Sequence, residues 1–213
     1  DLLVGNGPLS PLNHVSRVGS TGSPNASSSP TVSADGRYVG FAGGWTGFGS
    51  TNNNGTDVFV KDMSTGAVDN EHENAAGVNG GSGSGPPVIS ADGRWLVFQS
   101  SSGLVPGTPP SGMLYITDVP GNAVDVVSST TGNAAYADRG ASLPDVSANG
   151  RYVVFSSTAT NLAAGSTSSY EDVFLKDVVS GSVTRISTST TGGDGNGDSG
   201  YLGNAAYTGA KIS

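Results

Sequence analysis

The sequence predicts an all-β fold built from repeated four-stranded sheets. Three observations support this: the composition, an internal repeat of 57 residues, and turn signals at fixed places in each repeat. Glycine accounts for 34 of the 213 residues, and Val, Ile, Phe, Tyr and Trp occur in short clusters. Such a composition favours short strands joined by tight turns over helices. Sheets this small bury both faces only when neighbouring copies cover them, which predicts a β-propeller.

Two motifs define the repeat. The first, with the core Ser-Ala-Asp/Asn-Gly-Arg-aromatic, occupies residues 30–41, 87–98 and 144–155. The second, an apolar run that ends in Asp, occupies residues 57–62, 113–118 and 172–177. In each copy we expect a first strand that ends at the serine, an Asp-Gly or Asn-Gly turn of type I′ with two positive φ angles, and a second strand. The second motif forms the third strand, and a fourth follows a Gly-containing turn.

The two ends of the chain complement each other. Asp1–Val4 repeats the third-strand pattern, and 12–16 stands where a fourth strand belongs. Residues 201–203 and 210–213 are in phase with first and second strands. We therefore predict a single propeller domain over 1–213 with about four blades, one of them shared between the N- and C-terminal ends. The blades cover about 29–86, 87–143 and 144–199, with the split blade formed by 200–213 plus 1–18.

The two motifs resemble the WD40-like PD40 repeats of TolB-type β-propellers, and the resemblance extends over nearly the whole chain. It implies a propeller used mainly for protein or ligand contact, in a group whose functions are diverse. Propellers of this type usually have six blades, so the expected number of about four is a departure from the pattern.

Charge and composition exclude several classes of function. The net charge is −8 with only nine Lys and Arg, so we expect no nucleic-acid partner. No apolar run reaches the ~20 residues of a membrane span, so we expect no membrane insertion. The chain has no cysteine for disulfides or thiolate metal sites. A Lys-poor chain rich in Ser, Thr, Gly and Asn favours an extracellular or cell-surface location, with the periplasm also open. The start at Asp1 fits removal of a leader or a trimmed chain.

The candidate binding residues lie in the long loops, which we expect to share one face of the propeller. These loops cover 42–56, 70–86, 99–112, 128–143, 156–171 and 187–200. Trp45 and Phe48 are ligand or interface candidates, as an aromatic platform for a glycan or a neighbouring subunit. Phe48 is in phase with Leu162, which favours a packing role, so Trp45 is the better surface candidate.

In the Gly-rich segment 194–200, three residues with side-chain oxygens occupy alternate positions. Asp194, Asn196 and Asp198 could bind Ca²⁺, although no Glu follows at the bidentate position. An ordinary polar loop is the alternative. Asn25 and Asn54 begin N-glycosylation sequons, which also arise by chance in such a sequence.

The sequence predicts no catalytic residues. It has two histidines and no Gly-x-Ser-x-Gly motif. His72, between two glutamates, lacks metal-site spacing, and we expect a solvated loop there. Arg and Asp recur in every copy, which predicts a structural contact between strands two and three. The pairs would be Arg37 with Asp62, Arg94 with Asp118 and Arg151 with Asp177.

Two functions remain open, with an enzyme the least favoured third. The first is a non-catalytic exported structural protein, such as the protomer of an extracellular fibre or surface layer, in which half-blades of successive molecules pair. The second is a monomeric carbohydrate- or protein-binding module that uses the long-loop face. Self-association, another protein or a glycan are the corresponding partners, and Ca²⁺ is the one cofactor that the sequence leaves open.

Overall fold

The computed structural model describes most of the chain between residues 27 and 190 and shorter pieces toward both ends. The described residues are 3–5, 12–15, 17–18, 21–22, 27–44, 55–73, 76, 84–107, 109–121, 123–166, 170–190, 197–199 and 211–212. Within them the regular structure is β-strand, apart from one 3₁₀ turn at Thr131–Asn133. No helix in this part of the chain is long and apolar enough to cross a membrane.

Three four-stranded antiparallel sheets form the body of the molecule, each with its strands in sequence order. The first sheet contains β5 (Ser27–Val32), β6 (Tyr38–Gly43), β7 (Asp57–Asp62) and β8 (Val68–Asn70). The second contains β9 (Val88–Ile89), β10 (Trp95–Ser100), β11 (Met113–Asp118) and β12 (Ala123–Val126). The third contains β13 (Ala141–Val146), β14 (Tyr152–Ser157), β15 (Asp172–Asp177) and β16 (Val183–Arg185). These are the three complete blades that the repeat predicts.

The register of the two central strands is the same in every sheet. The aromatic residue that begins strand two pairs with the aspartate that ends strand three, as Tyr38 does with Asp62. Three positions further along, two aromatic residues face each other across the strands in each sheet. These pairs are Phe41 with Phe59, Phe98 with Tyr115 and Phe155 with Phe174, all fully buried. Their ring centroids are 5.6, 6.2 and 5.7 Å apart, so a cross-strand aromatic pair anchors the middle of each blade.

The turn between strands one and two differs from the expected type I′ hairpin. Only Gly36 has a positive φ, of 73°, and Asp35 does not, so a two-residue loop with two left-handed residues is absent. Instead Gly36 N donates to Ser33 O, and Ser33 and Tyr38 close a longer loop. Asp35 Oδ1 accepts from Ser33 Oγ at 2.6 Å and from Arg37 N at 3.0 Å, which holds the loop from inside. The prediction of a turn was right, but its type was wrong because these side-chain hydrogen bonds favour a different backbone.

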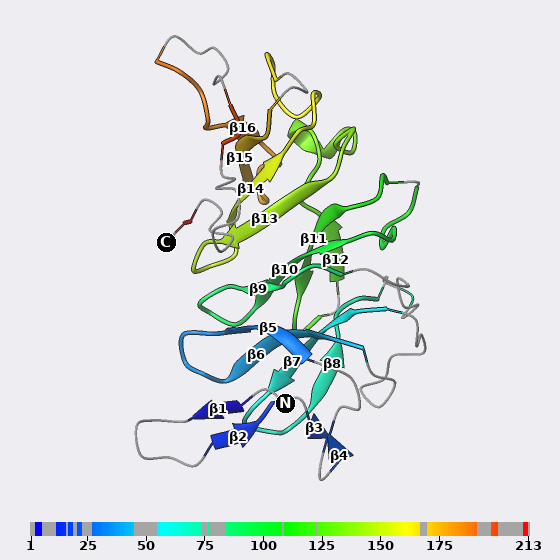
Figure 1. Ribbon diagram of the computed structural model, residues 1–213, viewed down its shortest axis with the longest axis vertical. Helices are drawn as coiled ribbons and strands as arrows, with labels where there is room; N and C mark the ends of the chain where they lie inside the picture. Colours follow the sequence, from blue (N-terminus) through cyan, green and yellow to red (C-terminus); the bar gives the residue numbers. More distant parts are fainter. Residues whose placement is uncertain are drawn as a thin grey trace.

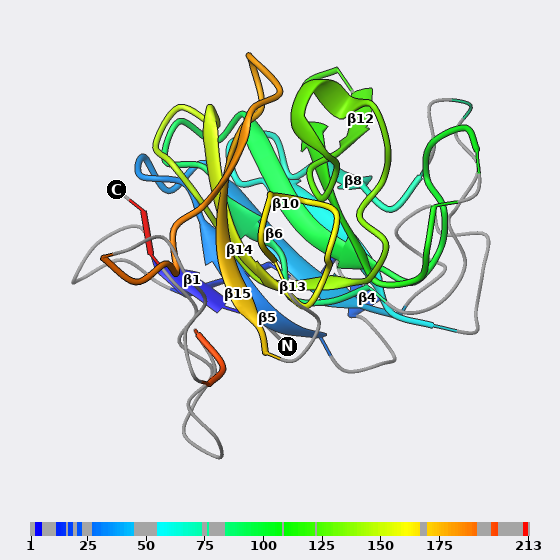
Figure 2. The same ribbon diagram turned by 90° about the horizontal axis from the view of Figure 1, so that it is seen from above.

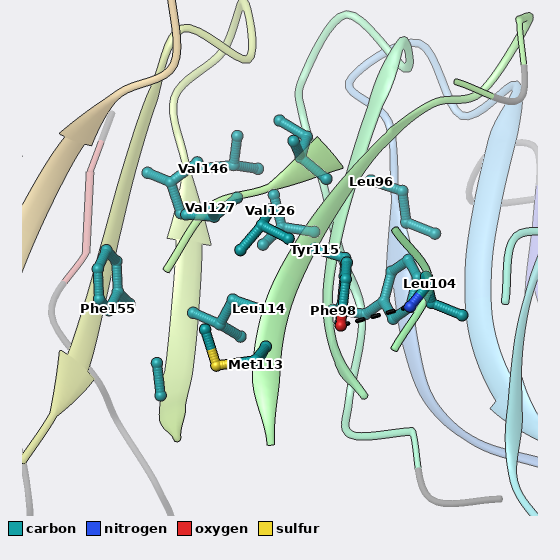
Figure 3. Close-up of a cluster of buried hydrophobic side chains, with 14 of the residues drawn as sticks. Leu96, Phe98, Leu104, Met113, Leu114, Tyr115, Val126, Val127, Val146 and Phe155 are labelled. Atoms are coloured by element: carbon teal, nitrogen blue, oxygen red, sulfur yellow. Dashed lines mark hydrogen bonds between the residues drawn. The ribbon is translucent and has the colours of Figure 1, made fainter. Parts of the chain in front are cut away.

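The three sheets stack face to face along the long axis of the molecule (Figure 1). Viewed from above, the sheets overlap with a progressive rotation (Figure 2). Apolar side chains fill the spaces between them, including Leu96, Leu114 and Val146 (Figure 3). Tyr115 also accepts a hydrogen bond from Leu104 N at 3.4 Å, which fixes the loop after β10 on the core. This arrangement of radially stacked four-stranded antiparallel blades is the β-propeller fold.

The N-terminal residues form two short hairpins. β1 (Leu3–Gly5) pairs with β2 (Leu12–His14), and β3 (Arg17–Val18) pairs with β4 (Thr21–Gly22). The β1–β2 pair has the connectivity expected for strands three and four of a blade. At the C-terminal end only Lys211 and Ile212 are described beyond residue 199. The blade shared between the two ends therefore stays a prediction.

Candidate functional site

Most of the predicted binding residues lie outside the described part of the chain. These are Trp45, Phe48, Asn25, Asn54, Asp194 and Asn196. Asp198 is described, and its Oδ1 accepts a hydrogen bond from Glu171 N at 2.7 Å. Ser199 N also donates to Glu171 O, so the end of this loop is attached to the start of β15. Among the described residues no group of three or more potential acidic, His or Cys ligands could hold a metal ion.

The predicted contact between strands two and three is present in all three blades. Arg37, Arg94 and Arg151 each hold the aspartate across the sheet, at 2.9, 3.1 and 2.9 Å between Nη2 and Oδ2. Each guanidinium also lies over the aromatic ring of the following residue, with 4.7 to 5.0 Å to its centroid. In the first blade, the Arg37 guanidinium holds the pKa of Asp62 well below its usual range. A contact repeated in every blade is structural.

His72 does not lie on a solvated loop, contrary to expectation. It is fully buried, and its Nδ1 lies 3.0 Å from Asp57 Oδ1. Its Nε2 lies 2.7 Å from Ser100 Oγ, on the neighbouring blade. No local pattern indicated this contact, because Ser100 follows His72 by 28 residues and lies on another sheet. The three side chains have the order of contacts of a Ser–His–Asp triad.

Two features describe how this network links strands. The three side chains are at most 1% exposed, so the network is enclosed between two blades. In the other two blades, the first residue of strand three likewise contacts the residue 15 positions later in the chain. Ser128 Oγ contacts Met113 Sδ in the second blade, and Ser187 Oγ donates to Asp172 Oδ1 in the third. His72 is therefore the first-blade version of a recurrent link between strand three and the segment after strand four.

The residue before His72 forms a second buried contact between blades. Glu71 Oε2 accepts a hydrogen bond from Thr117 Oγ1 of β11 at 2.8 Å. No described residue donates to Glu71 Oε1, which is also buried. Burial raises the pKa of Glu71 to about 7, because the neutral acid is less costly to enclose than the carboxylate.

Lys176 occupies the position on β15 that corresponds to Thr117 on β11. Its Nζ lies within hydrogen-bond distance of five oxygens, four of them in the loop of the preceding blade that contains Ser129 and Asn133. Burial lowers the pKa of Lys176 to about 8. In both interfaces, then, a polar side chain from strand three reaches the segment after strand four of the preceding blade.

The turns between strands one and two form a third contact between blades. Ala34 N donates to Ala91 O at 2.9 Å, and Asp92 N donates to Ala148 O at 3.0 Å. The aromatic residue of each blade also packs on the turn glycine of the next. A Cβ added to Gly93 would lie 2.6 Å from Tyr38 Cδ2, and one added to Gly150 would overlap the Trp95 ring. Glycine is thus needed there for the close approach as well as for its positive φ.

Among the described residues, the outer side of the first turn lacks these contacts. Val32 on β5 is 52% exposed, whereas Ile89 and Val146, its equivalents on β9 and β13, are each 6% exposed. An added Cβ on Gly36 would meet no atom within 4 Å. The face is therefore open at its turn end, whereas further along the same sheet Val39, Phe41 and Phe59 are buried in a cluster with Val15. We define Val32, Ala34 and Gly36 as the open blade face, and it is the candidate functional site of the described chain.

No protein-family model and no curated protein matches the sequence, whereas solved structures of similar fold do. TolB from Acinetobacter baumannii is 19% identical, with a TM-score of 0.48 over 74% of this chain and 31% of TolB. The β-propeller domain of the Trilobed protease from Pyrococcus furiosus, with an open velcro topology, is 10% identical, with a TM-score of 0.46 over 75% and 41% of the two chains. An oligogalacturonate lyase in complex with manganese is 14% identical, with a TM-score of 0.44 over 73% and 38%. The chain spans less than half the length of each. In fold it is similar to TolB and to other propeller proteins, enzymes among them.

Proposed function

We propose that this protein has a non-catalytic structural role outside the cell, as the protomer of an assembly such as a fibre or a surface layer. The open blade face carries the proposal. Val32 in the first blade is 52% exposed, whereas Ile89 and Val146, at the same position in the other two blades, are each 6% exposed. Burying such a surface against a further blade is favourable, because apolar area leaves water and turn hydrogen bonds form.

The non-catalytic part of the proposal is supported by the buried polar groups. The one Ser–His–Asp arrangement in the described chain is sealed between blades and recurs in altered form as a structural link. Glu71 and Lys176, two buried groups whose pKa values are shifted by burial, likewise have partners on neighbouring blades.

The location outside the cell is supported by composition. Nine Lys and Arg against 17 Asp and Glu give a surface suited neither to nucleic acid nor to an anionic membrane. Sequons at Asn25 and Asn54 and an oxygen-rich segment that includes Asp198 would fit glycosylation and Ca²⁺ binding there.

Light scattering and electron microscopy of the same sample, over a range of protein concentrations, test the proposal. Rods, filaments or sheets whose mass grows with concentration are the expected result. A compact monomer of 21.1 kDa at every concentration would overturn it. The monomeric binding module would then be the better candidate. Glycan binding that is saturable and lost in Trp45→Ala would support that alternative.

A further inference from the structure

We propose that a hollow between the first and second blades binds a primary ammonium group on an aliphatic stem, either a free alkylamine or the side chain of a lysine. The hollow has a volume of about 210 Å³ and lies between two sheets that are neighbours in the stack (Figure 1). This site is independent of the proposed assembly, because it is formed by two blades of one chain.

Part of the wall of the hollow is apolar. Tyr38 and Val60 contribute to it from the first sheet, and Val119 and Pro120 contribute from the turn between β11 and β12. Pockets for drug-sized ligands usually measure about 300–1,000 Å³, so this hollow suits a group the size of one side chain. Such walls can cover an aliphatic stem, whereas a metal ion requires oxygen ligands on most sides.

The polar part of the wall has a carboxylate without a balancing charge. Asp62 and Asp69 both line the hollow. Asp62 is held by Arg37, with 2.9 Å between Oδ2 and Nη2. Asp69 has no ion-pair partner among the described residues. Asp69 is therefore the carboxylate of the hollow that is available to a cation.

Glu71 places a second carboxylate behind Asp69. The ladder with β7 continues past the end of β8, because Glu71 N donates to Val58 O at 2.8 Å while Asp69 pairs with Val60. Asp69 and Glu71 are two residues apart on this ladder, so both face the second blade. Glu71 is 3% exposed, and no described residue donates to its Oε1. An enclosed acceptor in this interface thus lacks a donor, which is unusual for a buried polar atom.

The electrostatic environment of Glu71 also indicates a shortage of positive charge. Burial is the main cause of its raised pKa, and the negative charges of Asp69, Asp118 and Glu73 add to it in that order. Burial and the charges of Asp57 and Asp69 likewise raise the pKa of Glu73. A cation bound beside Asp69 would stabilise these carboxylates.

The interface between the second and third blades contains such a cation. Asp125 on β12 occupies the position of Asp69 on β8, because each pairs with the fourth residue of strand three. Burial lowers the pKa of Lys176 in this interface, and the charge of Asp125 opposes that shift by favouring the ammonium form. The chain itself therefore places an ammonium group on an aliphatic stem beside the equivalent aspartate.

Thr117 is the residue that makes the two interfaces different. It lies on β11 where Lys176 lies on β15, and its short side chain donates to Glu71 Oε2 at 2.8 Å. It has no charge to offer to Asp69. A lysine-like group that enters from outside would supply the charge that Thr117 lacks, with its stem on the apolar part of the wall. This is why we assign an alkylammonium to the hollow.

Titration with Nα-acetyl-lysine methylamide, followed by ¹H–¹⁵N NMR at pH 8, tests the site. We expect saturable shifts at the amides of Asp69 and Val119 in the wild type and at least a tenfold loss of affinity in Asp69→Asn. Asp69 is exposed, so the fold should tolerate the change. Asp125→Asn is the matched control, since Asp125 is also exposed and already has Lys176 beside it, and it should bind as the wild type does.

Thr117→Lys supplies the cation from within the chain. By analogy with Lys176 we expect this variant to melt at a higher temperature than the wild type and to lose binding of the probe. Undiminished binding in Asp69→Asn, or in a Thr117→Lys variant with the circular dichroism spectrum of the wild type, would overturn the inference. Asp69→Asn decides the question alone if Thr117→Lys does not fold.

Further probes identify the ligand. Nα-acetyl-norleucine methylamide has the same stem without the charge and should not bind, so binding equal to that of the lysine probe would overturn the inference. Calcium chloride that saturates the same amides more tightly than the lysine probe would also overturn it, in favour of a metal ion. Tighter binding of n-butylamine than of the peptide Gly-Gly-Lys-Gly-Gly would support a free alkylamine, and the reverse order would support a lysine side chain of a polypeptide.

Discussion

At the scale of single residues, the buried polar side chains decide how the blades fit together. His72 connects Asp57 in its own blade to Ser100 in the next, and all three are inaccessible to solvent. Such groups are costly to bury unless each has a partner, so they select one arrangement of neighbouring sheets over others. The exposed Arg–Asp pairs recur more regularly but contribute less, because solvent screens them.

Removing His72 tests this difference. We expect His72→Ala to lower the free energy of unfolding by about 3 kcal/mol, since it leaves a cavity and takes a partner from a buried aspartate. Arg94→Ala is the control, because Arg94 is 58% exposed and its pair with Asp118 should contribute less than about 1 kcal/mol. Urea denaturation of both variants gives the comparison. Equal losses would mean that the His72 network does not stabilise the contact between blades.

Glu71 should make stability depend on pH. Its pKa is about 7 in the folded state against an ordinary value of 4.5, so the unfolded chain releases the proton first as pH rises. The contribution of Glu71 is thus fully favourable below pH 4.5 and is lost as pH rises through about 7, by up to ~3 kcal/mol. Glu71→Gln keeps an acceptor for Thr117 Oγ1 and cannot titrate.

Denaturant unfolding at pH 5 and at pH 8 measures this effect. The wild type should lose more stability than Glu71→Gln between the two values, so the variant becomes the more stable protein at the higher pH. The same loss in both proteins would show that Glu71 does not titrate in this interval.

At the scale of the blade, the turn between strands one and two acts as both hairpin and interface. Its glycine has to be left-handed and must also leave room for the aromatic ring of the preceding blade. The first requirement applies to Gly36, Gly93 and Gly150, whereas the second applies only to the last two. The repeat thus contains its own control for separating backbone strain from packing.

Alanine at these glycines should give two different losses of stability. Gly36→Ala should cost about 1 kcal/mol, the price of a positive φ alone, in a monomeric sample. Gly150→Ala should cost about 3 kcal/mol or more, because its Cβ also displaces the Trp95 ring. Thermal melting of both variants checks this. Similar losses at the two positions would show that the ring moves aside without cost.

The sequence was sufficient to predict the blades because each one repeats its local signals. Serine, Asp or Asn, Gly and Arg recur at fixed spacing, and this placed strands one to three and the Arg–Asp contacts correctly. The turn type was wrong because Gly lies in a loop held by Ser33 and Asp35 side chains, and the Ser-x-Asp spacing was the available signal. His72 was misplaced because its partners are determined by how two sheets stack. That stacking is not a property of the local sequence.

At the scale of the whole molecule, the proposed assembly would bury the open blade face of one copy against another copy. The internal interfaces bury apolar side chains at their centre, while the chain as a whole carries a net charge of −8. Successive copies should therefore attract each other through the open blade face and repel each other through their overall charge. The balance between the two depends on ionic strength, because salt screens charge repulsion and leaves apolar burial intact.

Salt should therefore promote assembly. Raising sodium chloride from about 50 mM to about 500 mM shortens the Debye length below the separation of most surface charges, so we expect the critical concentration to fall several-fold. Light scattering across a salt series measures it. Val179→Arg adds one positive charge at a position away from the open blade face. Its critical concentration should fall with salt in the same way, from a slightly lower value at low salt. Dissolution of the assembly by salt would contradict an apolar contact, because only a contact held by ion pairs weakens when charges are screened.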